Sequence, residues 1–313
     1  MTAIHSPLLP HLHRAAARQD GVAFVLVMWV IAMMSVLLGS FALVARTEGL
    51  QSRHLFDTTT ARYAAEAGLN LAVYGLSKSD PLQKWVADGR PYTFMFDGAE
   101  VEISITDDAG KIDINAADAA SLRNLFVGAG VEEQKADELA GAIQDWRDPD
   151  DLTSLNGAER ADYRAVGLPY SPRNAPFETL SEIQQVFGMD YDLYTRIEPA
   201  ITMFSGRSNP SAAYAPMEAL MAIPGMTPEQ AQDLINQRQQ LPPGMLGQAA
   251  GNLLMPDGSP LMADGGGLTY SIKSRATLPN GASTILDATI RLGGMNSAGR
   301  PYVVLRWRDG ETA

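Results

Sequence analysis

The chain opens with one uninterrupted apolar segment. Residues 22–45 contain no charged side chain, and the short arm before them carries Arg14 and Arg18. About 20 apolar residues, at 1.5 Å rise per residue, span the roughly 30 Å hydrocarbon layer of a membrane. The pattern therefore predicts a single transmembrane helix. Positive charge on its N-terminal side predicts a cytoplasmic N-terminus, with the bulk of the chain on the opposite side.

Helical periodicity continues beyond the apolar segment. Residues 46–77 contain no proline, and small or apolar side chains recur near a 3.6-residue spacing. These positions are Leu50, Leu55, Ala61, Ala64, Ala65, Leu69, Leu71, Ala72 and Leu76. The sequence therefore predicts one long helix that ends near residues 79–81, with its first half in lipid and its second half in water.

After this helix, the helical period gives way to an alternation of apolar and polar residues. Residues 92–96 and 101–106 alternate on either side of Asp97-Gly98, which predicts a β-hairpin. Three further strands are predicted over 268–278, 283–292 and 302–308, after a Gly- and Pro-rich stretch, 242–267, that predicts a mobile loop. Because these strands flank a helical block, we expect helices inserted into one antiparallel sheet, with the long N-terminal helix on its apolar face.

The helical block contains a weak internal repeat. Residues 112–143 and 217–238 each read as a short helix, a glycine turn and a second helix, which resembles the helix-hairpin-helix. That motif often binds DNA by directing turn amides at phosphate. Glu132, Glu133 and Glu229 lie beside the two turns in place of basic residues. We therefore expect the hairpins to be packing units; the alternative is a membrane-anchored helix-hairpin-helix DNA receptor.

Charge and composition limit the functions that this chain can have. The net charge of −12 argues against broad affinity for nucleic acid, whose phosphates require Lys and Arg. There are no cysteines, which excludes disulfides, thiol nucleophiles and Cys zinc sites. All histidines lie at or before His54, and no phosphate-binding loop, nucleophile elbow or His-Glu-x-x-His motif is present. The sequence predicts a protein that is not an enzyme. Catalysis by a pair of carboxylates is the one enzymatic alternative that these absences leave open.

The densest group of carboxylates is the acidic loop, residues 145–159, which begins Asp-Trp-Arg-Asp-Pro-Asp-Asp. Calcium takes six to eight oxygen ligands from such loops. Carboxylates this close repel one another unless a cation or an arginine neutralises them. Two interpretations are open: a calcium-binding loop, or a solvated acidic turn with helix-capping Asp residues. The spacing of the acidic residues differs from that of an EF-hand.

The junction before the apolar segment predicts processing. Gln19-Asp20-Gly21 is followed at once by the apolar run. A secretory signal peptide is cut after its apolar core. Here the small residue precedes the core, so the helix would be retained after cleavage, as in type IV prepilin leaders. The alternative is a plain single-pass anchor.

The leader, the long helix and the acidic loop together resemble the K-type minor pseudopilins of the bacterial type II secretion system (general secretion pathway protein K). The resemblance covers essentially the whole chain and is weaker at 208–216. The residues that carry it best are 145–151, 156–159 (Asn-Gly-Ala-Glu), Tyr163, 170–177 (Tyr-Ser-Pro-Arg-Asn-Ala-Pro-Phe), 182–183, 186–189 and Tyr194.

The resemblance implies an α+β fold: a long N-terminal transmembrane helix packed on an antiparallel pseudopilin sheet, with a large inserted α-helical domain containing helix-hairpin-helix-like repeats. It implies cleavage after Gly21 by a prepilin peptidase and methylation of Val22. It also implies a structural calcium site in the insertion. Its candidate ligands are Asp148, Asp150, Asp151, Asn156 and Glu159.

The same resemblance implies a single-pass inner-membrane protein, mostly periplasmic, that forms the tip of a pseudopilus. Its implied partners are the I-, J- and H-type minor pseudopilins, the major pseudopilin and exported proteins. Major pilins carry Glu at the fifth mature residue, where this chain has Leu26. A buried carboxylate without a partner amine is costly, so an apolar residue suits a subunit with no neighbour above it. The expected segments are leader 1–21, transmembrane helix 22–45, amphipathic helix and first strands 46–110, insertion 111–240, and loop with last strands 241–313.

Overall fold

The computed structural model describes residues 20–242, 253–261, 266–293 and 299–310. Residues 1–19 of the predicted leader, and residues 243–252 and 262–265 of the predicted mobile loop, lie outside these ranges. The chain forms two compact units that divide between Phe56 and Asp57. The segment boundaries expected from the sequence stay predictions.

Helix α1 runs from Asp20 to Leu76 and passes through both units. Among the described residues it is the one helix long and apolar enough to cross a membrane, with a mean hydropathy of 2.6 in its most apolar window. The hydroxyls of Ser35 and Ser40 donate to carbonyls one turn earlier, at 2.8 and 2.9 Å. Their polar groups are thus satisfied within the helix, as an apolar surrounding requires. The long helix predicted from the sequence is confirmed.

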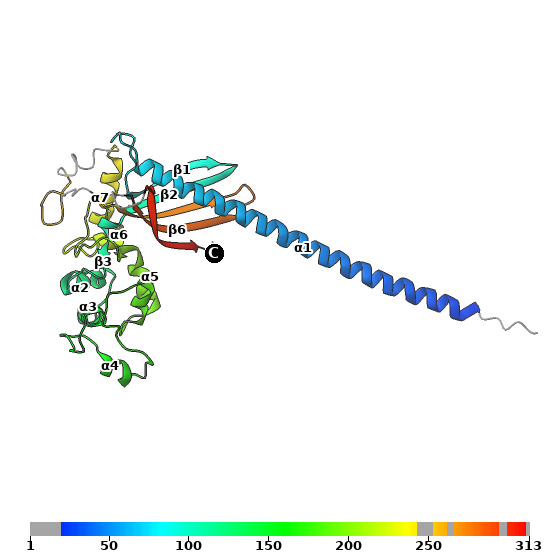
Figure 1. The fold of residues 1–313 in the computed structure, drawn as a ribbon, viewed down its shortest axis with the longest axis horizontal. Helices are drawn as coiled ribbons and strands as arrows, with labels where there is room; N and C mark the ends of the chain where they lie inside the picture. Colours follow the sequence, from blue (N-terminus) through cyan, green and yellow to red (C-terminus); the bar gives the residue numbers. More distant parts are fainter. Residues whose placement is uncertain (1–19, 243–252, 262–265, 294–298, 311–313) are drawn as a thin grey trace, which may run out of the picture. The chain divides into compact units, whose positions relative to one another are not determined.

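The second unit is built on a five-stranded antiparallel sheet in the order β1-β2-β5-β6-β7 (Figure 1). The strands are β1 (Asp88–Phe96), β2 (Ala99–Asp107), β5 (Thr269–Thr277), β6 (Ser283–Leu292) and β7 (Tyr302–Gly310). Asp97 and Gly98 both have positive φ, which the tight β1–β2 turn requires. Strand β2 pairs directly with β5, so the predicted sheet split by an insertion is confirmed.

The C-terminal part of α1, from Ala61 to Leu76, lies on one face of this sheet (Figure 1). Small side chains allow a close approach: Ala61, Ala65 and Ala72 are fully buried with Val101 and Ile103 of β2. At Gly68 an added Cβ would lie 2.2 Å from the Ser274 hydroxyl of β5. The prediction that small and apolar residues form one buried face of the helix is therefore confirmed for this part of α1. Leu50 and Leu55 are exposed, because they precede the part of the helix that meets the sheet.

Between β2 and β5 the chain forms a helical block with its own hydrophobic core. Its helices are α2 (Ala119–Gly128), α3 (Glu133–Arg147), α4 (Arg160–Ala165), α5 (Tyr191–Ile197), α6 (Met217–Leu220) and α7 (Pro228–Gln240). Its 3-10 segments are η1 (Asp108–Gly110), η2 (Leu180–Gln185) and η3 (Glu198–Ala200). A short parallel pair joins β3 (Ile112–Asp113) to β4 (Ile201–Thr202). The inserted helices expected from the sequence are present.

The two predicted hairpins correspond to α2–α3 and α6–α7. They pack against each other closely: a Cβ added at Gly128, the end of α2, would lie 2.4 Å from the carbonyl oxygen of Met221. This contact supports a packing role. Their identity as helix-hairpin-helix motifs stays a prediction, since α6 is only four residues long.

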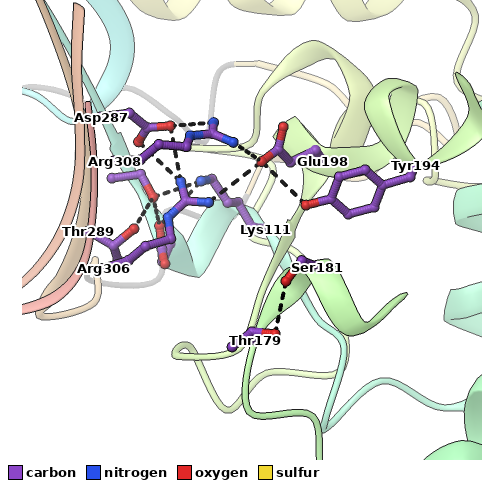
Figure 2. Close-up of polar contacts among 11 residues, drawn as sticks. Lys111, Thr179, Ser181, Tyr194, Glu198, Asp287, Thr289, Arg306 and Arg308 are labelled. Carbon is purple, nitrogen blue, oxygen red and sulfur yellow. Dashed lines mark hydrogen bonds and ion pairs between the residues drawn. The ribbon is translucent and has the colours of Figure 1, made fainter. Parts of the chain in front are cut away.

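Ion pairs join the helical block to the sheet (Figure 2). Arg308 of β7 bridges two carboxylates, with Nη1 2.8 Å from Glu198 of η3 and Nη2 2.8 Å from Asp287 of β6. Arg306 contacts the same two carboxylates at 3.6 and 3.1 Å. Because four charges form one network, and three of them are only partly exposed, the network fixes η3 against the sheet more strongly than an isolated surface pair would.

Candidate functional site in the acidic loop

The acidic loop begins in the last turn of α3 and folds back over it. Asp145 is fully buried, and its carboxylate accepts the backbone N–H of Ser154 at 3.1 and 3.2 Å. A Cβ added at Gly157 would lie 2.0 Å from Asp145 Oδ2. Gly141, one turn earlier, would likewise place a Cβ 2.8 Å from the backbone of Asn156. Glycine at 141 and 157 thus lets the loop backbone lie directly on the helix and on the Asp145 carboxylate.

Polar contacts fix the first part of the loop to neighbouring segments. The Arg147 guanidinium donates to the carbonyl oxygens of Ile114 and Ala117, which lie before α2. Asn174 donates to the Asp150 carbonyl at 2.8 Å and to the Asp151 carboxylate at 3.1 Å. The two segments of strongest resemblance, 145–151 and 170–177, are therefore bonded to each other.

Two carboxylates in this region are incompletely compensated. Glu159 is 3 % exposed and caps the first turn of α4, where its side chain faces the backbone N–H of Asp162, but neither carboxylate oxygen makes a hydrogen bond of normal geometry; Oδ1 of Asp148 is also buried without one. Burial, followed by the charge of Asp145, raises the pKa of Glu159. Burial, followed by the charges of Asp150 and Asp145, raises the pKa of Asp148. Like charges without hydrogen bonds are costly inside a protein, so a bound cation would offset a real penalty here.

The candidate ligands predicted from the sequence divide into two groups. Glu159 and Asp148 point unpaired oxygens into the fold beside Asp145. Asp150, Asp151 and Asn156 lie at the exposed tip of the loop. Among the described residues, no three His, Cys, Asp or Glu side chains stand close enough to form a ready metal site. The donor chemistry fits calcium, whose preferred ligands are oxygens, and calcium binding stays a prediction.

Asp145 was not among the candidate ligands predicted from the sequence, yet the structure buries it beside Glu159 and Asp148. A signal for its position existed: Gly141 and Ala142, one turn before it in α3, lie on the buried face of that helix. Residues three and four apart share a helix face. The spacing alone therefore directs Asp145 inward, toward Glu159.

The predicted processing site lies at the start of α1. Gly21 and Val22 fall within the first turn of the helix, and the Val22 side chain is 71 % exposed. Cleavage after Gly21 and methylation of Val22 stay predictions.

Comparison with known proteins identifies the relatives of this chain. Residues 103–206, which hold the second half of β2 and helices α2 to α5, match the family described as type II secretion system, protein K. The protein K of Klebsiella pneumoniae is 30% identical over 206 residues, which is 59% of this chain and 62% of that protein. The protein K of Pectobacterium carotovorum is 29% identical over 180 residues, which is 51% of this chain and 54% of that protein. The matches thus span about half to two thirds of the length of these relatives.

A solved structure shares the fold. A chain of the GspK-GspI-GspJ complex from the enterotoxigenic Escherichia coli type 2 secretion system superposes with a TM-score of 0.53 at 18% identity. The match covers 86% of this chain and 99% of that chain. The family model, the relatives and the fold thus agree: residues 103–206 match the type II secretion system protein K domain, and the chain is similar to proteins of that family.

Proposed function

We propose that this protein is a minor pseudopilin that forms the tip of the periplasmic pseudopilus and supports protein export across the outer membrane. The observation that carries the proposal is the protein K family domain at residues 103–206, joined to a long helix with an exposed apolar surface. The role is structural and involves no catalysis.

In this mechanism α1 first sits in the inner membrane, with its N-terminus in the cytoplasm and the sheet and helical block in the periplasm. A prepilin peptidase cleaves after Gly21, and Val22 becomes the methylated N-terminus. The helix then leaves the membrane to pack with the helices of the I-, J- and H-type minor pseudopilins and the major pseudopilin. The name of the solved complex, which joins proteins K, I and J, supports this set of partners.

Two features support a place at the tip. Leu26, the fifth residue after the cleavage site, has no charge that would need a neighbouring N-terminal amine. The helical block of roughly 160 residues between β2 and β5 adds bulk that a closely stacked shaft would not accommodate, whereas the end of a filament can. There it can also contact exported proteins.

Calcium is proposed as a structural ion of the acidic loop. Asp148, Asp150, Asp151, Asn156 and Glu159 would hold it, and the buried Asp145 would face the same ion. When bound, the ion supplies positive charge that neutralises the unpaired carboxylates and holds the loop on α3. The unpartnered oxygens of Glu159 and Asp148 are the structural basis for this proposal.

Processing and export can be tested together in a bacterium that lacks its own protein K. Gly21→Trp should abolish cleavage and stop secretion, while the matched variant Gly21→Ala keeps a small residue and should support both. Mass spectrometry of the membrane-extracted protein reads the N-terminus and its methyl group. A chain that begins at Val22 in the Trp variant, or normal secretion by it, contradicts the proposal.

Partner binding separates this function from the DNA-receptor alternative. Native mass spectrometry of the detergent-extracted chain should show complexes with I- and J-type minor pseudopilins. A DNA receptor would instead show gel-shift affinity that falls steeply with salt, as phosphate binding requires. Such a salt-dependent shift, without pseudopilin complexes, favours the receptor.

A further inference from the structure

A cavity of about 350 Å³ lies where three parts of the second unit meet: the turn after α1, the end of β2 and the start of β5. Trp85, Tyr214 and Tyr270 supply aromatic walls, and Asp107 supplies a carboxylate. Lys84 also lines the cavity. The volume is at the lower end of the range for ligand sites, roughly 300–1,000 Å³. It suits a side chain or a small molecule.

The carboxylate is held in place by backbone groups. Asp107 is the last residue of β2, is 1 % exposed, and accepts the N–H of Ala109 and the N–H of Gly267, each at 2.8 Å. A Cβ added at Gly266 would lie 2.3 Å from Asp107 Oδ2. Glycine at this position therefore allows the chain that returns from the helical block to close on the carboxylate.

The aromatic walls are also fixed. Tyr270 donates its hydroxyl to the Gly267 carbonyl at 2.8 Å. Trp85 stacks on Tyr92 of β1, with ring centroids 4.1 Å apart and an angle of 2° between the planes. Burial raises the pKa of both Tyr214 and Tyr270, so the phenols are neutral at physiological pH. The cavity is thus preorganised, with three aromatic side chains and one buried carboxylate in its lining.

We propose that this cavity binds an organic cation, an alkylammonium or guanidinium group such as the end of a lysine or arginine side chain. Aromatic rings attract such cations through their quadrupoles, by about 0.5–1 kcal/mol at exposed sites and about 2 when desolvated. A buried carboxylate adds a charge of the opposite sign. The proposal goes beyond the pseudopilin role and does not depend on the calcium site.

The charges around Asp107 show that its own chain leaves it incompletely neutralised. Asp108 repels it, and Arg207 attracts it, while Asp88 adds a further negative charge near Tyr214. Burial outweighs the hydrogen bonds and Arg207, and it raises the pKa of Asp107 to about 6. An incoming cation would favour the ionised carboxylate. Binding should therefore be strongest above this pH and weaken as Asp107 is protonated.

The experiment uses the full chain in detergent micelles with 5-fluorotryptophan incorporated, because four tryptophans give few, separable fluorine signals. The Trp85→Phe variant assigns the Trp85 signal. Butylammonium and N-acetyl-lysine methylamide should shift this signal at about pH 7.5, whereas n-butanol, the neutral analogue, should not. Lowering the pH to about 5 should weaken amine binding about tenfold through protonation of Asp107.

Matched variants localise the charge. Asp107→Asn should weaken amine binding at least tenfold and remove its pH dependence, while Asp97→Asn, the same change in the exposed β1–β2 turn, should leave both unchanged. Lys84→Met removes a positive charge that repels the amine, and it should strengthen amine binding severalfold. This variant still tests the proposal if the Asp107 variant does not fold. Tighter binding of the lysine derivative points to a partner's side chain, and tighter binding of butylammonium to a free amine. Equal shifts with butanol, or amine binding that Asp107→Asn and Lys84→Met leave unchanged, would overturn the proposal.

Discussion

The substitution Glu159→Gln tests the electrostatics of the acidic loop. In the metal-free protein Glu159 is buried, its oxygens have no hydrogen-bond partner, and the charge of Asp145 faces it. Two like charges about 4 Å apart repel by roughly 4 kcal/mol at an effective dielectric constant of about 20, and the repulsion falls as the separation grows. An amide removes this repulsion and can donate a hydrogen bond. Glu159→Gln should therefore stabilise the metal-free protein by about 1–3 kcal/mol.

Calcium should remove or reverse the difference in stability between the two proteins. An ion at about 100 times its Kd stabilises the native state by about 2.7 kcal/mol. For a unit of this size, 1 kcal/mol shifts the Tm by about 2–4 °C. The wild type should thus gain about 5–10 °C on calcium addition. The variant should begin a few degrees higher and gain almost nothing, because a neutral amide is a weaker calcium ligand than a carboxylate.

The assay is thermal unfolding of the full chain in detergent, with EDTA or with calcium, followed by intrinsic fluorescence. Glu100→Gln is the matched control, because Glu100 is an exposed residue of β2, outside the acidic loop. It should leave both Tm values unchanged. Lower stability of Glu159→Gln in EDTA would mean that Glu159 has a favourable partner in the native state. An undiminished calcium increment in the variant would remove Glu159 from the ligand set.

Three further outcomes are expected. Gly157→Ala, whose Cβ would lie 2.0 Å from Asp145 Oδ2, should weaken calcium binding at least tenfold in titration calorimetry; an unchanged Kd would place the ion elsewhere. Gly68→Ala, whose Cβ would lie 2.2 Å from the Ser274 hydroxyl, should cost about 1–3 kcal/mol of unfolding free energy in a denaturant titration. Ser274→Ala should restore part of that loss in the double variant, and strict additivity would refute the contact. The pKa of Asp107, raised from 3.8 to about 6, means that protonation favours the folded state. Stability should rise by up to about 3 kcal/mol as the pH falls from about 7 to 4, and Asp107→Asn should flatten this rise.

The sequence predicts the sheet and the long helix well, because their hydrophobic periods report burial on one face. The period-2 alternation on both sides of Asp97-Gly98 corresponds to β1 and β2, and the alanine-rich stripe of α1 corresponds to the face on the sheet. The pairs β3–β4 and the segments η1–η3 were not predicted. They span two to six residues, too few to show a period, and contacts between distant segments form them.

The acidic loop could be located from its composition, whereas the role of each carboxylate could not. Asp145 and Asp150 look equivalent in the sequence, but one is fully buried under Gly157 and the other is exposed. The difference arises because the chain turns back over α3 after Arg147, whose guanidinium bonds the carbonyls of Ile114 and Ala117. Which acidic residues become buried is therefore decided by contacts between segments about 30 residues apart.

The buried carboxylates of the second unit divide by how their charge is compensated. Asp88 pairs with Arg90 at 2.8 Å, and Asp108 pairs with Lys111 at 3.5 Å, both where the helical block joins the sheet. Among the described residues, Glu159 has no such ion pair and no hydrogen bond to its oxygens. A protein gains nothing in stability from an uncompensated buried charge, since replacing it with a neutral group removes the penalty. Compensated pairs are thus explained by the fold alone, whereas for the uncompensated carboxylate of the acidic loop we propose compensation by a cation from outside the chain.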